Sequence, residues 1–165
     1  MPASPPPFVY FVTDTSTSSA LARKLLITPV RLNFRLLGIL TTWKDYRVCW
    51  FLNRQMKADF RQIDGYQKPL EASQSNISFR TFHYCSELDR LNFYLFNNRS
   101  GNNYLLPELK AIDLILMVKG DDAAGMLREL QEKIRSNAAL QRVIEIDPEK
   151  LKSGNNLVFD EEDIQ

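Results

Sequence analysis

Two cysteines and one histidine have the widest chemical repertoire in this chain. Cys49, Cys85 and His83 are the complete set of both residue types. His83 and Cys85 are two residues apart in a segment that alternates like a strand, so their side chains stand roughly 7 Å apart. That separation is too long for the hydrogen bond that activates a thiol. Three such side chains also lack the fourth ligand of a usual zinc site, so we predict neither a catalytic cysteine nor a bound metal.

A second group of reactive side chains lies between residues 97 and 120. A polar turn there leads into a nearly continuous apolar run, Ile112 to Val118, which contains one acid, Asp113. A carboxylate within an apolar strand must be paired or hydrogen-bonded, or it stays protonated. We expect either a structural lock between loop and strand or a ligand or partner site formed by Arg99, Glu108 and Asp113. A carboxylate enzyme, with the two acids as general acid and base, is the weaker alternative.

Basic and aromatic residues interleave between residues 31 and 68. This segment holds eight basic and three acidic residues, a net charge of +5, and both tryptophans of the chain. Such a composition is typical of surfaces that contact phosphates and stack on bases. The nucleic-acid alternative, with RNA as partner, assigns the contacts to Arg35, Lys44, Arg47 and Arg54. The competing interpretation is an ordinary solvated face between core aromatics.

Length and composition further narrow the class of protein to which this chain can belong. The 165 residues are 44% apolar and 25% charged, with 21 basic against 20 acidic side chains, which is typical of one globular domain. No apolar run approaches the roughly 18–20 residues of a membrane helix. The six glycines form neither a dinucleotide-binding motif nor a phosphate loop, so no cofactor is predicted. No secretory signal pattern is present, and we expect a cytoplasmic protein.

The two ends of the chain differ from its middle. Residues 1–30 contain four early prolines and a Ser/Thr-rich run, which predicts a disordered or extended leader. Residues 160–165 include four consecutive acids and form a predicted acidic tail, which solubilises the protein, shields the basic segment or contacts a partner. Residues 31–159 are then a single predicted domain.

Hydrophobic periodicity predicts the elements that position these groups. Alternation predicts strands at residues 32–40, 59–63, 77–86, 91–97, 141–146 and 157–159, and the apolar run predicts a central strand at 112–118. Residues 65–76 are polar and turn-rich, and are predicted as a loop. The strands at 77–86 and 91–97 are expected to form a hairpin.

Two helices are expected, over residues 43–55 and 122–136. Thr42 followed by Asp45 resembles a capping box. The apolar face of the first helix is expected to carry Trp43, Tyr46 and Trp50 and to pack tightly against a sheet. Since runs of strands separate two isolated helices, the predicted fold is α+β: a single mostly antiparallel sheet of about five or six strands with two packed helices.

The order of several sequence blocks resembles a known family. Residues 106–114 (LPELKAIDL) resemble the Ile-Pro-Glu-x-x-x-Val-Asp-Tyr signature that names the IPExxxVDY family of small bacterial proteins. Similar blocks are Leu37-Gly38-Ile39, Lys44 to Trp50, Asn98-Arg99-Ser100, Leu151-Lys152-Ser153 and Asn156 to Phe159. Leu106, Ile112 and Leu114 depart from the signature, the last by loss of a hydroxyl. The family has no assigned activity, so the resemblance implies a domain over about residues 31–160 and a focus on residues 107–113, without a mechanism.

No complete catalytic set emerges from these patterns. The sequence therefore favours a small non-catalytic binding or adaptor domain that contacts a protein or a small ligand. Nucleic-acid binding through residues 31–68 is the main alternative. Neither hypothesis identifies the ligand or partner.

Overall fold

The computed structural model describes residues 33–69, 76–140 and 142–159. The predicted leader at residues 1–30 and the predicted acidic tail at 160–165 lie outside the described residues. Within the described ranges, neither helix is long and apolar enough to cross a membrane.

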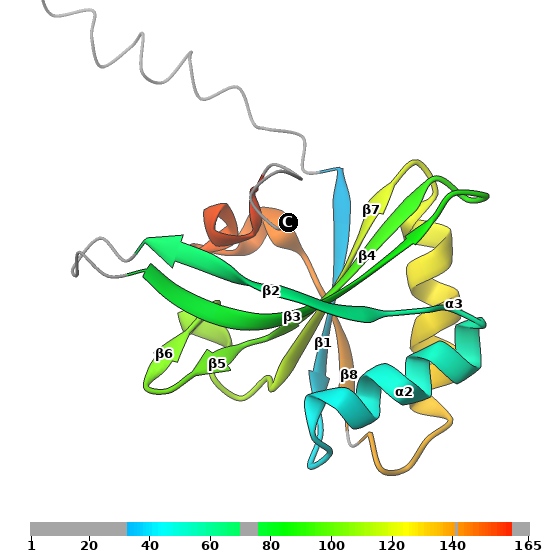
Figure 1. The fold of residues 1–165 in the computed structure, drawn as a ribbon, viewed down its shortest axis with the longest axis horizontal. Coiled ribbons are helices and arrows are strands. Elements are labelled where there is room, and N and C mark those ends of the chain that lie inside the picture. The colour runs from blue at the N-terminus through cyan, green and yellow to red at the C-terminus, as the bar shows by residue number, and fades with distance from the viewer. Residues whose placement is uncertain (1–32, 70–75, 141, 160–165) are drawn as a thin grey trace, which may run out of the picture. The chain divides into compact units, whose positions relative to one another are not determined.

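Six strands form one antiparallel sheet in the order β2-β3-β4-β7-β1-β8 (Figure 1). They are β1 (Phe34–Leu40), β2 (Arg61–Pro69), β3 (Asn76–Ser86), β4 (Leu91–Asn97), β7 (Leu114–Gly120) and β8 (Arg142–Ile146). A smaller sheet pairs β5 (Arg99–Ser100) with β6 (Asn103–Tyr104). The helices are α2 (Asp45–Met56) and α3 (Ala123–Arg135), and three 3-10 turns are η2 (Pro107–Leu109), η3 (Pro148–Lys150) and η4 (Gly154–Leu157). The predicted α+β class, with its mostly antiparallel sheet and two helices, is confirmed.

The central strand of the sheet is the one that the apolar run predicted. β7 lies between β4 and β1, and its first five residues are buried. A strand covered on both faces needs apolar side chains at every position, which is why this run does not alternate. The predicted hairpin is also present, as β3 and β4.

Helices cover one face of the sheet. Val48, Leu52, Leu127 and Ile134 from α2 and α3 pack with strand residues such as Leu37 in one apolar cluster. Both helices lie on the same side of the strands in Figure 1. Each Å² of apolar surface removed from water contributes about 25 cal/mol to the free energy of folding. This layer of packed apolar side chains is therefore a main source of stability.

Among the described residues, no α-helix covers the opposite face of the sheet. Leu105, Leu106 and Ile112 from the segment after β6, together with Leu157 and Phe159, pack there against strand residues. Gly38 of β1 makes close packing possible, since a Cβ at that position would lie 2.9 Å from the Ile146 side chain. The layer on this face is therefore made of 3-10 turns and loops, which the sequence did not reveal as a packing unit.

The predicted loop at residues 65–76 is wrong over its first part. β2 continues from Arg61 to Pro69, and its register with β3 shifts between Ile63 and Tyr66. At the shift, a Cβ on Gly65 would come within 2.8 Å of the Phe79 carbonyl oxygen, so glycine permits the close approach of the two strands. The irregularity breaks the alternation and hides the strand from a period-two search.

The predicted orientation of the first helix is also wrong. Tyr46 is 64% and Trp50 is 56% exposed, whereas Val48 and Leu52 are fully buried. The buried stripe follows the aliphatic residues, because two or three aromatic side chains at helical spacing fit either face of a short helix. The helix begins at Asp45 after Lys44, and Thr42 does not cap it.

Two further boundaries differ from the predictions. The central strand begins at Leu114 rather than at residue 112, so Asp113 precedes it and is exposed. Residues 157–159 do not form a strand, because the chain turns through η4 as far as Leu157.

Candidate functional site

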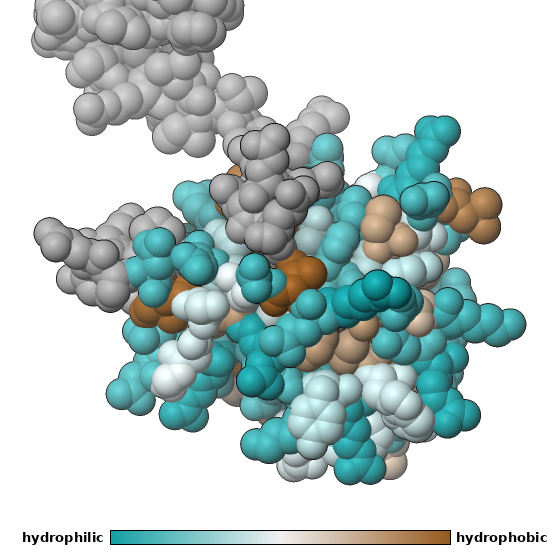
Figure 2. All heavy atoms as spheres, viewed as in Figure 1, coloured by the Kyte–Doolittle hydropathy of each residue, from teal (hydrophilic) through white to brown (hydrophobic). Residues whose placement is uncertain are grey.

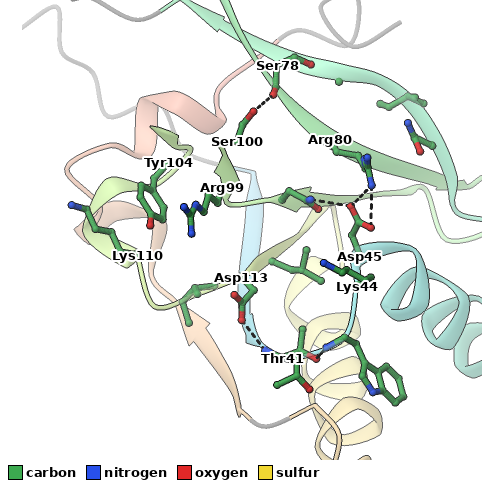
Figure 3. Close-up of a pocket in the computed structure, with 18 residues that line it drawn as sticks. Thr41, Lys44, Asp45, Ser78, Arg80, Arg99, Ser100, Tyr104, Lys110 and Asp113 are labelled. Carbon is green, nitrogen blue, oxygen red and sulfur yellow. Dashed lines mark hydrogen bonds and ion pairs between the residues drawn. The ribbon is translucent and has the colours of Figure 1, made fainter. Parts of the chain in front are cut away.

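A polar cleft of about 720 Å³ opens at one edge of the main sheet (Figure 3). β1 and β4 end at this edge and β7 begins there, because Leu114 pairs with Ile39 on one side and with Asn97 on the other. The start of α2, parts of β2 and β3, and the β5–β6 hairpin form the remaining walls. Its volume lies within the range of roughly 300–1,000 Å³ for small-molecule sites.

Asn98 holds the segment that forms one wall of the cleft. Its side chain is fully buried, and its Nδ2 donates to the carbonyl oxygens of Leu109 (2.8 Å) and Ile112 (2.9 Å). Its Oδ1 accepts from the Leu106 N–H at 2.8 Å, and its carbonyl accepts from the Leu105 N–H. We call these five residues the Asn98 cluster. One amide side chain thus satisfies the buried Leu106 N–H and Ile112 carbonyl, and it adds a second donor to the Leu109 carbonyl, which also accepts from the Ile112 N–H.

Glu108 faces away from the cleft toward the C-terminal turns. Its carboxylate accepts from the Ser153 N–H at 2.9 Å and from the Ser153 hydroxyl at 2.5 Å. Partial burial raises the pKa of Glu108, but the hydrogen bonds from Ser153 and from the backbone of Glu108 and Lys152 together outweigh it and hold the pKa below its ordinary value. Glu108 does not line the cleft that Asp113 lines, so the two acids predicted as a site do not converge.

Arg99 and Lys110 form a cationic side of the cleft. The Arg99 guanidinium lies 6.0 Å from the centre of the Tyr104 ring, and the Lys110 ammonium lies 5.7 Å from it. Figure 3 shows the three side chains together on one side. Arg99 Nε donates to the Gly101 carbonyl, which orients the guanidinium. Among the described residues neither cation has an acidic partner, so two positive charges at one aromatic ring remain uncompensated.

Asp45 forms the opposite side, together with Arg80. The Asp45 carboxylate is buried and accepts from Arg80 Nη1 at 3.0 Å, from Asn97 Nδ2 at 2.9 Å and from the Tyr46 N–H at 2.7 Å. The Asn97 Oδ1 atom is buried and has no hydrogen-bond partner among the residues that the structure describes. Lys44 also lines this side and has no ion pair within the described part of the chain. Figure 3 shows Lys44, Asp45 and Arg80 facing the Arg99 side across the cleft.

Asp113 lies between the two sides. Its Oδ2 accepts from the Thr41 N–H at 2.9 Å, and its own N–H donates to the Ile39 carbonyl. The predicted lock between loop and strand is therefore present. The expected burial of this carboxylate is wrong, because Asp113 precedes β7 and is exposed. One carboxylate oxygen thus locks the loop, and the other is open to the cleft.

The structure separates the four residues of the predicted nucleic-acid surface. Arg35 lies in β1, at the opposite end from the cleft, and lines other surface hollows. Lys44, Arg47 and Arg54 belong to α2 or directly precede it. Arg47 lies over the Trp43 ring at 4.3 Å from its centre. Two of the four predicted cations therefore lie in α2, and Lys44 directly precedes it.

Sequence reasoning missed Asp45, Arg80 and Asn97 as cleft residues. They come from α2, β3 and β4, and 35 to 52 positions separate Asp45 from the other two. The one available signal was an acid in the first turn of a predicted helix, and a capping role explains such an acid equally well. Only the strand order brings these three side chains together.

The cysteines and the histidine lie outside the cleft lining. Burial, followed by the nearby charges of Asp45 and Asp59, raises the pKa of the Cys49 thiol to about 11. His83 stacks on Tyr94 at 4.6 Å and hydrogen-bonds to Asn92 at 3.0 Å. Within the described ranges, no three His, Cys, Asp or Glu side chains gather closely enough to hold a metal ion.

No protein-family model matches this chain, and a search of curated proteins finds no significant match. The resemblance to the IPExxxVDY signature therefore stays a prediction. Its quoted blocks do meet in space: Asn98 bonds to the segment of residues 105–112, Asp113 to Ile39, and Glu108 to Ser153.

Proposed function

We propose that this protein is a small non-catalytic binding domain whose cleft takes an anionic ligand. The ligand class is a polyanion that carries phosphate or carboxylate groups. Lys44, Arg99 and Lys110 would neutralise its charge, and the open oxygen of Asp113 would accept a hydrogen bond from a hydroxyl or amine.

One observation carries the proposal. Lys44, Arg99 and Lys110 line the same cleft and have no acidic partner in the described part of the chain, whereas Arg80 is paired with Asp45. Uncompensated cations at a concave surface raise the local concentration of anions and bind them by charge-assisted hydrogen bonds. The polar lining favours a charged ligand over an apolar one.

The remaining features favour binding over catalysis. A catalytic thiol is not supported, since the Cys49 thiol is buried with a raised pKa. Glu108 is occupied by Ser153 and does not line the cleft, so it supplies no second carboxylate there. Both cysteines are free, and a free exposed thiol at Cys85 favours a reducing compartment such as the cytoplasm.

Calorimetric titration of the full chain with tripolyphosphate, citrate and inorganic phosphate at low salt tests the proposal. We expect the multivalent anions to bind more tightly than phosphate, because two cations at Tyr104 reach two anionic groups at once. The double variant Arg99→Gln/Lys110→Gln should weaken this binding at least tenfold.

The matched control removes two cations away from the cleft. Arg128 on α3 and Arg142 on β8 are exposed and do not line it. The double variant Arg128→Gln/Arg142→Gln has the same net charge as the cleft variant. Equal loss of affinity in both variants would show non-specific charge attraction, and absence of any anion binding to the unchanged protein would refute the proposal.

A further inference from the structure

An exposed aromatic and basic strip continues from the cleft along α2. We call Tyr46, Arg47, Trp50 and Arg54 the α2 stripe. At 3.6 residues per turn, these four positions fall on one side of the helix, opposite the buried Val48 and Leu52. Figure 2 shows this surface as hydrophilic residues interspersed with residues of near-neutral hydropathy.

Arginines orient the aromatic rings of this surface. The Arg54 guanidinium lies 5.0 Å from the centre of the Trp50 ring, and Arg47 lies 4.3 Å from that of Trp43. Trp50 is 56% exposed despite this contact. An indole that is held on one side by a cation and is open on the other is a platform for a flat ring.

The stripe adjoins the cleft at Trp43 and Lys44. Trp43 and Lys44 line the cleft, and Arg47 lies over Trp43 on the helix side. Positions 46 to 54 span about 12 Å along the helix axis. Since stacked nucleotides advance by about 3.4 Å each, this length accommodates a short stretch of a single strand.

We propose that the α2 stripe and the adjoining cleft bind single-stranded nucleic acid, with bases stacked on Trp50 and Tyr46 and phosphates on Arg47, Arg54 and the cleft cations. The proposal deepens the proposed function, on which it rests, by naming the polyanion. A single strand presents both a phosphate and an unstacked base at each nucleotide, and this alternation matches a stripe of cations and rings.

The composition of the stripe favours a nucleic acid over a protein partner. The large exposed apolar side chains of α2 are Tyr46 and Trp50, and none is aliphatic. From Lys44 to Lys57 the one acid is Asp45, which is buried and paired with Arg80. Arg47 and Arg54 lie at aromatic rings and have no ion pair within the described residues, and the phosphates of a nucleic acid supply the opposite charge at every nucleotide.

Fluorescence anisotropy with labelled 12-nucleotide strands tests the proposal on the full chain. The probes are single-stranded RNA and DNA of the same sequence and the corresponding duplexes. We expect the single strands to bind more tightly than either duplex. Trp50→Ala should weaken binding at least fivefold, and Leu88→Ala, which removes an apolar side chain that is 94% exposed at the β3–β4 turn, should leave it unchanged.

Salt dependence and intrinsic fluorescence give independent readouts. The logarithm of affinity should fall linearly with the logarithm of salt concentration, and Arg54→Gln should reduce the slope by about 0.7, the value expected for one lost phosphate contact on a single strand. Arg128→Gln on α3 is the matched control. Stacking on Trp50 should quench tryptophan emission, and Trp50→Tyr should retain binding while removing that part of the quenching.

The outcomes separate this inference from the proposed function. Binding of tripolyphosphate without binding of any oligonucleotide would overturn the inference and leave the anion site standing. Oligonucleotide binding that Trp50→Ala does not weaken would overturn it too. The inference would also fail if the duplexes, or poly-glutamate used as a competing polyanion without bases, bound as tightly as the single strands. Loss of both kinds of binding would refute both proposals.

Discussion

The Asn98 cluster and the cationic side of the cleft are built from the same stretch of chain, residues 97–113, and differ in how far their polar groups are satisfied. In the cluster, one buried amide pairs with three backbone groups. In the cleft, Arg99 and Lys110 lie at the Tyr104 ring without an acidic partner among the described residues. One region completes its hydrogen bonds internally, and the other leaves charges available.

This difference separates a positioning role from a binding role. A buried polar group without a partner costs about 1–3 kcal/mol, so the cluster has to be complete for the loop to hold its shape. An exposed cation stays hydrated at little cost and is free to pair with a ligand. Substitution in the cluster should therefore change stability, and substitution in the cleft should change affinity.

Asn98→Ala should produce the largest loss of stability. It leaves the Leu106 N–H and the Ile112 carbonyl buried without partners and removes one of the two donors to the Leu109 carbonyl, and we expect the free energy of unfolding to fall by about 3–5 kcal/mol. Urea denaturation measures the change. Asn103→Ala in β6, a half-buried amide with no side-chain hydrogen bond to a described residue, should cost less than about 0.5 kcal/mol. A loss below about 1 kcal/mol for Asn98→Ala would show that water enters and replaces the amide.

Asp45→Asn should change stability and affinity in opposite directions. Loss of the carboxylate weakens the charge-assisted hydrogen bonds from Arg80 and Asn97. We therefore expect the free energy of unfolding to fall by about 1–3 kcal/mol. The same change removes a negative charge from the cleft, so tripolyphosphate should bind a few-fold more tightly. Urea denaturation and calorimetry measure the two effects on the same preparation.

The control for Asp45→Asn is an acid with an exposed partner. Asp59 pairs with Arg61, and both side chains are mostly exposed. Asp59→Asn should change stability by less than about 0.5 kcal/mol and leave anion affinity unchanged. Weaker anion binding in Asp45→Asn would mean that Asp45 positions Arg80 for the ligand rather than opposing it.

The sequence predicts the fold well where one physical signal dominates. The uninterrupted apolar run ending at Val118 gives the central strand, because only a strand covered on both faces tolerates it. Gly65 hides the continuation of β2, since a register shift interrupts the alternation. Trp50 is misplaced because an aromatic side chain satisfies the hydrophobic pattern and yet tolerates exposure, whereas the aliphatic Val48 and Leu52 identify the buried face.

The candidate site is only partly visible in the sequence. Arg99 and Asp113 are predicted and both line the cleft, while Glu108 bonds to Ser153 instead. A turn sequence shows that polar groups gather, but not which direction each side chain takes. Asp45 and Arg80 meet only because the sheet places β3 next to β4, which in turn pairs with β7, and strand order depends on long-range packing that periodicity does not encode.

Glu108→Gln should have a smaller, pH-dependent effect. Its pKa in the folded protein is lower than the ordinary value of 4.5, so its contribution to stability is complete above that pH and is lost as the pH falls through the folded-state pKa. At pH 7 we expect a loss of roughly 0.5–1 kcal/mol, because the contact with Ser153 is exposed. Urea denaturation at several pH values from neutral to acid measures the effect.

The difference between the Glu108→Gln variant and the unchanged protein should shrink toward zero at acid pH. Ser153→Ala removes one of the same hydrogen bonds and should reproduce part of the effect with the same pH dependence. A constant difference across the pH range would indicate that the amide disturbs packing of the turns and that the carboxylate charge contributes nothing.

Trp50→Ala should have the smallest effect on stability and extends the same comparison to the two faces of α2. Trp50 is mostly exposed, and its contact with Arg54 is worth about 0.5–1 kcal/mol at such a site. The better helix propensity of alanine offsets part of that contact, so we expect a net change of at most about 0.5 kcal/mol by urea denaturation. Leu52→Ala, on the buried face two residues away, should cost about 2–5 kcal/mol. If Trp50→Ala were as costly as Leu52→Ala, the indole would be part of the core in solution, and it could not also be an open platform for a base.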